Sequence, residues 1–74
     1  MAKREAFYEC VLSAERNEYR FHFRAWSAEA AAVALGAELH AYGFTAPGTI
    51  EVRDARGRLV ARAAYDPGAG AAAS

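Results

Sequence analysis

The sequence predicts a single α+β domain with the element order β-β-α-β-β. Residues 19–26 alternate aromatic and polar or cationic side chains with a period of two, which is typical of a strand. Residues 28–42 contain no proline and follow Ser27, whose hydroxyl suits a helix N-cap. Residues 49–54 and 58–65 are two further alternating segments on either side of a turn motif, so a second hairpin is expected after the helix.

The first predicted strand, residues 6–13, carries apolar groups on both of its faces. Tyr8, Cys10 and Leu12 fall on one face, and Phe7 and Val11 fall on the other. A strand that is apolar on both sides suits the interior of a sheet better than its edge. The polar residues that follow it are expected to form a hairpin loop.

The predicted helix has one face that should meet the sheet. Its members recur at helical spacing and are Ala28, Ala31, Ala32, Leu35, Leu39 and Tyr42. Glu29 lies in the first turn, where the helix dipole favours an acid. Gly43 is expected to end the helix in a left-handed conformation, with Phe44 folding back onto the last turn.

The second hairpin and the C-terminus complete the domain, which is predicted to span residues 5–66. Asp54 to Gly57 match a type I turn in which the glycine closes the hairpin as a bulge. The inward face of the fourth strand stays open between Leu59, Ala61, Ala63 and Tyr65 on one side and Val60 with its even-numbered neighbours on the other. Residues 67–74 are rich in alanine and glycine, and we expect them to form a disordered tail.

Two hairpins joined by one helix predict a four-stranded antiparallel sheet with the helix packed on one face. Strand order 2-1-3-4 places the doubly apolar first strand inside the sheet, and we prefer it for that reason. The alternative sets the second strand beside the third and requires one right-handed parallel crossover.

One helix covers one side of such a sheet, so the other side is open. The partner-binding residues predicted there are Phe7, Arg20, His22, Arg24, Trp26 and Arg53. Tryptophan and arginine are enriched at the energetic centres of protein interfaces. The same groups could bind phosphates and stack a base, or they could form an ordinary solvated face with Glu–Arg pairs across the strands.

A second candidate surface is the outward side of the helix, which is poor in charge. Its small residues are Ala30, Val33, Ala34, Ala37 and Ala41. Small side chains allow two helices to approach closely, so this ridge is a candidate dimer seam or docking surface. Alanine is also simply the best helix former, which is the alternative explanation.

The residues predict no catalytic, cofactor or metal site. His22 and His40 are expected on opposite sides of the molecule, so neither can assist the other or share a metal. Cys10 is the one cysteine, and we expect a small buried hydrophobe, unless its strand is an exposed edge where it could cross-link two copies. We therefore expect a protein that is not an enzyme.

Composition limits the classes of partner. Nine basic and nine acidic residues give a formal net charge of zero, so overall charge does not favour nucleic acid. No apolar run approaches the length of a membrane span, and the N-terminal residues do not resemble a signal peptide, so a cytoplasmic location is expected.

The plan of a compact ββαββ chain with a hairpin such as residues 49–60 (TIEVRDARGRLV) resembles small proteins of phages and mobile elements, among them anti-CRISPR inhibitors. That resemblance covers residues 6–65 and extends to size and style. It implies a short cytoplasmic inhibitor that covers a nucleic-acid or partner site on a CRISPR effector complex. Another protein is thus the expected partner, a homodimer is the next consideration, and a nucleic-acid-binding module is the alternative function.

Overall fold

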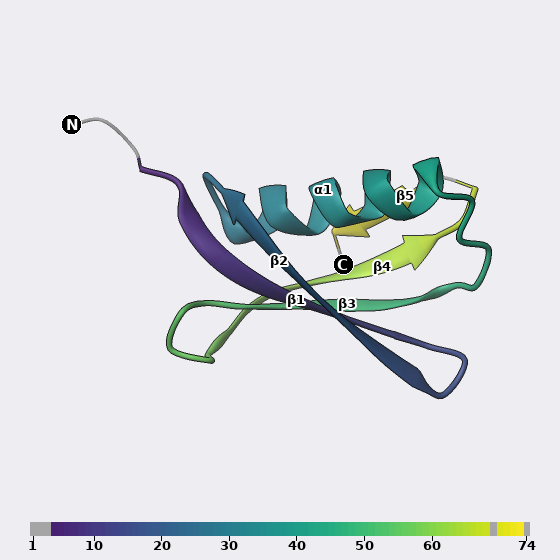
Figure 1. Ribbon diagram of the computed structural model, residues 1–74, viewed down its shortest axis with the longest axis horizontal. Helices are drawn as coiled ribbons and strands as arrows, with labels where there is room; N and C mark the ends of the chain where they lie inside the picture. The colour runs from purple at the N-terminus through teal and green to yellow at the C-terminus, as the bar shows by residue number, and fades with distance from the viewer. Residues whose placement is uncertain (1–3, 69, 74) are drawn as a thin grey trace.

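The computed structural model describes residues 4–68 and 70–73, which form one twisted β-sheet with a single helix across it (Figure 1). The predicted α+β class and the order of the first five elements are confirmed. Their bounds are β1 (Ala6–Ala14), β2 (Asn17–Ala25), α1 (Ala28–Ala41), β3 (Gly48–Arg53), β4 (Leu59–Asp66) and β5 (Gly70–Ala73).

All strand pairs in the described sheet are antiparallel, and the strand order is β2-β1-β3-β4-β5. The predicted order 2-1-3-4 is therefore confirmed, and the parallel alternative is wrong. β1 lies between β2 and β3, where both of its faces are used. Close approach to β3 is possible at Gly48, because a Cβ atom there would lie 2.5 Å from the carbonyl oxygen of Ser13.

The fifth strand is the main departure from the expected architecture. The prediction of a disordered tail over residues 67–74 is wrong for Gly70–Ala73, because their backbone pairs with β4 from Asp66 to Ala63. Residues 69 and 74 lie outside the described part of the chain. β5 also contacts α1, beside which it is drawn in Figure 1. Backbone hydrogen bonds require no side-chain pattern, so this strand has no periodic signal in the sequence.

The hydrophobic core lies between the sheet and α1. Its buried members are Cys10, Leu12, Ala14, Ala25, Ala28, Ala31, Ala32, Leu35, Leu39, Ala46, Ile50, Val52, Ala63 and Tyr65. On β4, Ala63 and Tyr65 face inward, which settles the alternative left open by the sequence. The register shifts after Val52, so Val60 is the extra residue of a bulge and Leu59 lies opposite Arg53.

Both predicted helix ends are confirmed. The Ser27 hydroxyl accepts a hydrogen bond from the backbone N–H of Ala30 at 3.1 Å. At the other end Gly43 has a φ of 76°, and the N–H of Phe44 donates to the carbonyl oxygen of Leu39 at 2.9 Å, which is a Schellman motif. The inward position predicted for Tyr42 is wrong: as the C-cap residue it is 84% exposed, because the helical spacing ends at Ala41.

The two hairpin turns differ in how well their residues suit them. Glu15 and Arg16 form the two-residue turn between β1 and β2 with φ values of 51° and 66°, a left-handed conformation that most side chains disfavour. The turn between β3 and β4 is the predicted type I turn, with Gly57 at a φ of 80°. Asp54 closes it by accepting the N–H of Gly57 at 2.9 Å.

Candidate binding surface

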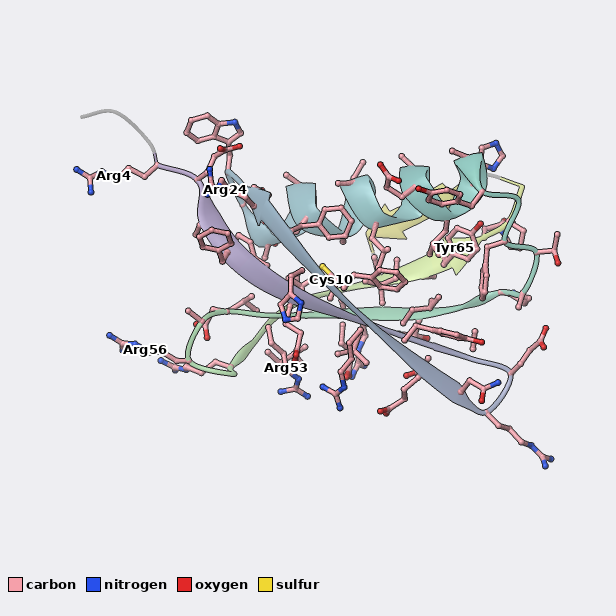
Figure 2. All side chains as sticks on the ribbon, viewed as in Figure 1. Arg4, Cys10, Arg24, Arg53, Arg56 and Tyr65 are labelled. Carbon is pink, nitrogen blue, oxygen red and sulfur yellow. The ribbon has the colours of Figure 1, made fainter. Side chains whose placement is uncertain are left out.

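The open face is the side of the sheet that points away from α1. Figure 2 shows the division: Cys10 and Tyr65 lie on the side of the sheet that faces α1, and Arg53 points to the other side. Strand alternation assigns the odd residues of β1 and β3 and the even residues of β2 to this open face.

Cross-strand register arranges the open face into rows. One row runs Arg20–Val11–Glu51–Arg62, and the next runs His22–Glu9–Arg53–Leu59. A cation and a carboxylate therefore meet repeatedly across the strands, which is the arrangement that stabilises an exposed antiparallel face.

Most cations on the open face have a carboxylate beside them. Arg20 lies 3.4 Å from Glu9 and 3.7 Å from Glu18, and the imidazole of His22 lies 3.7 Å from Glu9. Glu51 lies 3.0 Å from Arg62. Arg53 lies 3.7 Å from the same carboxylate. The centre of the face is thus close to electrically neutral, as expected of an ordinary solvated face.

Arg24 differs from these arginines. Within the described residues no carboxylate lies within 4.0 Å of its guanidinium, which instead lies over the ring of Phe7, 4.8 Å from the centroid. The two residues are directly opposite each other in the β1–β2 register. Phe7 is 62% exposed, so this cation–π pair presents an aromatic edge and a positive charge to solvent together.

A shallow hollow of about 290 Å³ lies next to this pair. It is lined by Phe7, Tyr8, Glu9, His22, Asp54, Ala55 and Gly57. β1 and β3 are antiparallel and Glu9 pairs with Arg53, the last residue of β3. The residues of β1 that precede Glu9 therefore lie beside the β3–β4 turn, and the hollow forms between them. Two of the six predicted partner-binding residues, Phe7 and His22, therefore border one concave site.

At the β3–β4 turn the hollow is lined by Asp54, whose carboxylate organises the turn. Its Oδ1 atom accepts the backbone N–H groups of Arg58 at 3.0 Å and Arg56 at 2.9 Å. The hydrogen bond from Arg58, followed by that from Arg56 and the two guanidinium charges, lowers the pKa of Asp54 below its ordinary value. The carboxylate thus stays charged and holds the turn in one shape.

The turn also brings in cations that sequence analysis did not assign to a site. Arg56 and Arg58 are exposed, and among the described residues neither has a carboxylate within 4.0 Å. Figure 2 shows Arg4, Arg24 and Arg56 at the same end of the molecule. The predicted strand order could have indicated that Arg56 and Arg58 lie near Phe7, since it places the β3–β4 turn beside the start of the first strand.

Two of the expected features of the open face need correction. Trp26 was expected to continue the alternation of β2, but it lies one residue beyond Ala25, where the strand ends. Its side chain is 59% exposed and does not line the hollow. Val11, which the alternation places on the same strand face as Phe7, is not exposed with it but buried, between Arg20 and Glu51 in the register, where long side-chain stems can cover it.

The predicted helix ridge lies on the outward side of α1. Ala30, Val33, Ala37 and Ala41 are exposed and Ala34 is half-buried. Val33, at 57% exposure, is the largest apolar side chain of the ridge. Small side chains with no charged neighbour between them offer little to orient a partner, so the ridge is the weaker of the two surfaces.

The groups with chemical potential lie apart. Cys10 is fully buried, and burial, with a smaller effect of the Glu9 charge, raises the pKa of its thiol to about 11. His40 lies near the C-terminal end of α1 with its Nδ1 atom 3.0 Å from the carbonyl oxygen of Pro67, whereas His22 lies on the open face. Within the residues that the structure describes, no three His, Cys, Asp or Glu side chains converge as metal ligands would.

Comparisons with protein-family models, with curated proteins and with solved structures find no match to this chain. Nor does the described part of the chain contain a helix of the length and apolar character needed to cross a membrane. Function is therefore inferred from the surface itself.

Proposed function

We propose that this chain is a non-enzymatic binding module whose partner is another protein. Its binding surface is the basic end, which we define as Phe7, His22, Arg24, Trp26, Arg56 and Arg58. The observation that carries the proposal is the pair of Arg24 and Phe7 beside a hollow, with exposed aromatic area and a guanidinium that no described carboxylate neutralises. Aromatic residues and arginine at a concave site are typical of interface centres.

Charge favours a protein partner over nucleic acid. Arg20, Arg53 and Arg62 each lie within 4.0 Å of a carboxylate, and the chain has no net charge, so the middle of the open face offers no row of unpaired cations to replace counterions along a phosphate backbone. Trp26 lies one residue beyond the end of β2, so the strand alternation that presents stacking residues in sheet-based single-strand binders does not hold it.

The chemistry of the basic end defines what the partner presents. Its guanidinium groups favour carboxylates, while the hollow itself is lined by the rings of Phe7 and Tyr8 and by two carboxylates, Glu9 and Asp54. In an inhibitor of the anti-CRISPR type, the target would be an acidic protein–protein site on an effector complex. A nucleic-acid groove of the effector is itself positively charged and would repel this surface.

Site-specific photo-crosslinking tests the proposal even when the partner has not been identified. A benzophenone amino acid at Phe7 is expected to give a protein adduct in cells that express the chain. The same group at Ala64, an exposed residue of β4 directly opposite Thr49 and far from the hollow, is the matched control and should give none. An adduct that nuclease digestion removes would show that the partner is nucleic acid. Equal adducts at both positions would show that the contact is unspecific.

The inhibitor form of the proposal has a separate test. Co-expression with an active CRISPR effector complex should restore survival of a plasmid that the complex targets. Phe7→Ala combined with Arg24→Ala should abolish this protection, while Arg62→Ala, which removes an ion-paired arginine of the same face, should keep it. Equal protection by all three chains would show that the basic end is not the surface used.

A further inference from the structure

The outer edge of β2 is the longest unpaired strand edge in the described sheet. β2 is the first strand of the order β2-β1-β3-β4-β5, and its nine residues pair with β1 alone. The β1–β2 register continues through nine residue pairs without a shift. β2 contains no proline, bulge or lysine to block this edge, and its charged side chains, which can also discourage pairing, all lie on the open face of the sheet.

Turn geometry decides which backbone groups of β2 are free. The two-residue turn of Glu15 and Arg16 is flanked by Ala14 and Asn17, and such a turn closes on a hydrogen-bonded pair. Because hydrogen-bonded and non-hydrogen-bonded pairs alternate, the odd residues of β2 bond to β1. The N–H and C=O groups of the even residues therefore point outward, and these residues are Glu18, Arg20, His22 and Arg24.

We infer that this edge pairs with the same edge of a second copy, antiparallel about a two-fold axis at Phe21. This register uses all nine residues of the strand. It places only even residues in hydrogen-bonded positions, so the outward N–H and C=O groups of both copies are satisfied together. The two sheets then form one continuous ten-stranded sheet with a helix from each copy on the same side.

The charges along β2 favour this register. Glu18 lies opposite Arg24 of the partner subunit, and Arg24 lies opposite Glu18 of the partner subunit. Arg24 has no carboxylate within 4.0 Å among the described residues of its own copy, and the second copy supplies one. The Glu18 side chain is 62% exposed, so it is accessible for this contact. Opposite charges directly across a strand pair are stabilising and like charges are destabilising.

Neighbouring registers of the same phase bring like charges together. An axis at Arg20 places that residue opposite Arg20 of the partner subunit, and an axis at His22 places Arg20 opposite Arg24 of the partner subunit. On the helix side, the axis at Phe21 places Tyr19 opposite Phe23 of the partner subunit. Tyr19 is 39% exposed and Phe23 is half-buried, so both rings have surface left to bury.

A proline substitution tests the edge without breaking the sheet. The N–H of His22 points outward, so His22→Pro removes a bond to the partner and none to β1, and proline is tolerated on edge strands in this position. His22→Ala, which keeps the N–H, is the matched control. Sedimentation equilibrium should show a dimer for the wild type and for His22→Ala and a monomer for His22→Pro, with all three folded by circular dichroism.

Charge reversal tests the register. Glu18→Arg and Arg24→Glu should each weaken the dimer, and the double variant should restore it because the pair is re-formed with its signs exchanged. Backbone amides of the four even residues should gain hydrogen-exchange protection as the protein concentration rises. A wild type that stays monomeric, or a dimer that survives His22→Pro and is lost in Ala37→Glu on the helix ridge, would overturn the inference.

The dimer and the proposed function share His22 and Arg24, but variants at other positions separate the two. Glu18→Arg should weaken the dimer and leave the crosslink from position 7 intact. Phe7→Ala should leave the dimer intact, because Phe7 lies on β1 and not on the paired edge.

Discussion

The phenolic hydroxyl of Tyr65 donates a hydrogen bond of 2.7 Å to the carbonyl oxygen of Phe44. This bond joins β4 to the residue that follows the helix cap. Tyr65 is the largest fully buried side chain among the described residues, and its ring lies 5.8 Å from that of Phe44 by centroid. Phe44 in turn contacts Tyr19 of β2 edge to face at 5.8 Å. Three aromatic rings thus connect the last predicted strand, the end of α1 and the edge strand.

Replacing Tyr65 with phenylalanine should destabilise the fold. The substitution keeps the ring but removes a partly buried hydrogen bond to the Phe44 carbonyl, which should cost about 0.5–1.5 kcal/mol. Urea denaturation should show a lower midpoint with an unchanged m-value. Tyr42→Phe is the control, because Tyr42 is 84% exposed, and it should change stability by less than about 0.5 kcal/mol. Equal effects of both substitutions would contradict the role given to the buried hydroxyl.

The turn of Glu15 and Arg16 should be improvable. Both residues have positive φ, a conformation that costs most L-residues roughly 1–2 kcal/mol each and that asparagine and glycine adopt more readily. The double substitution Glu15→Asn and Arg16→Gly is therefore expected to raise the unfolding free energy by about 1 kcal/mol, part of the gain being offset by the entropy of glycine. Thermal denaturation measures it. Arg56→Gly, in a turn position without positive φ, should destabilise instead.

Asp54 should make the stability depend on pH. Its pKa is lower in the folded chain than in an unfolded one, so the charged form favours folding. The stabilisation is fully present above the ordinary pKa of an aspartate and is lost as the pH falls through the lower, folded-state pKa. Asp54→Asn should be less stable than the wild type at neutral pH, with a difference that shrinks under strong acid. Because Asp54 is near the surface, added salt should reduce the effect. A difference that is constant with pH would assign the effect to geometry and not to charge.

Cys10 should be unreactive in the folded protein. Its thiol is fully buried and its pKa is about 11, so the thiolate that attacks disulfide reagents is scarce at about pH 8. Labelling with a chromogenic disulfide should be slow in buffer and fast in concentrated urea. Removal of reductant should produce no disulfide-linked dimer. Rapid labelling of the native chain would show that β1 opens readily, and the cross-linking alternative would then return.

Much of the architecture was predictable because its signals are local. The alternation of β2, the caps at Ser27 and Gly43, and the Asp54–Gly57 turn are each contained within a few residues. Strand order also followed from a single property, the two apolar faces of β1, because only an interior position buries both. By contrast, Trp26 and Tyr42 were misplaced by one residue at the ends of their elements, where periodicity stops and a cap or bend takes over.

By itself, the sequence determined the class of fold, the helix and its ends, and the side of the sheet on which Arg20, His22 and Arg53 lie. Tertiary structure alone decided which arginines are neutralised, that Arg24 lies over Phe7, that the β3–β4 turn completes a hollow, and that Gly70–Ala73 extend the sheet. Contacts of this kind depend on the register among strands distant in the chain and on backbone hydrogen bonds. Neither leaves a periodic trace in the residues that make them.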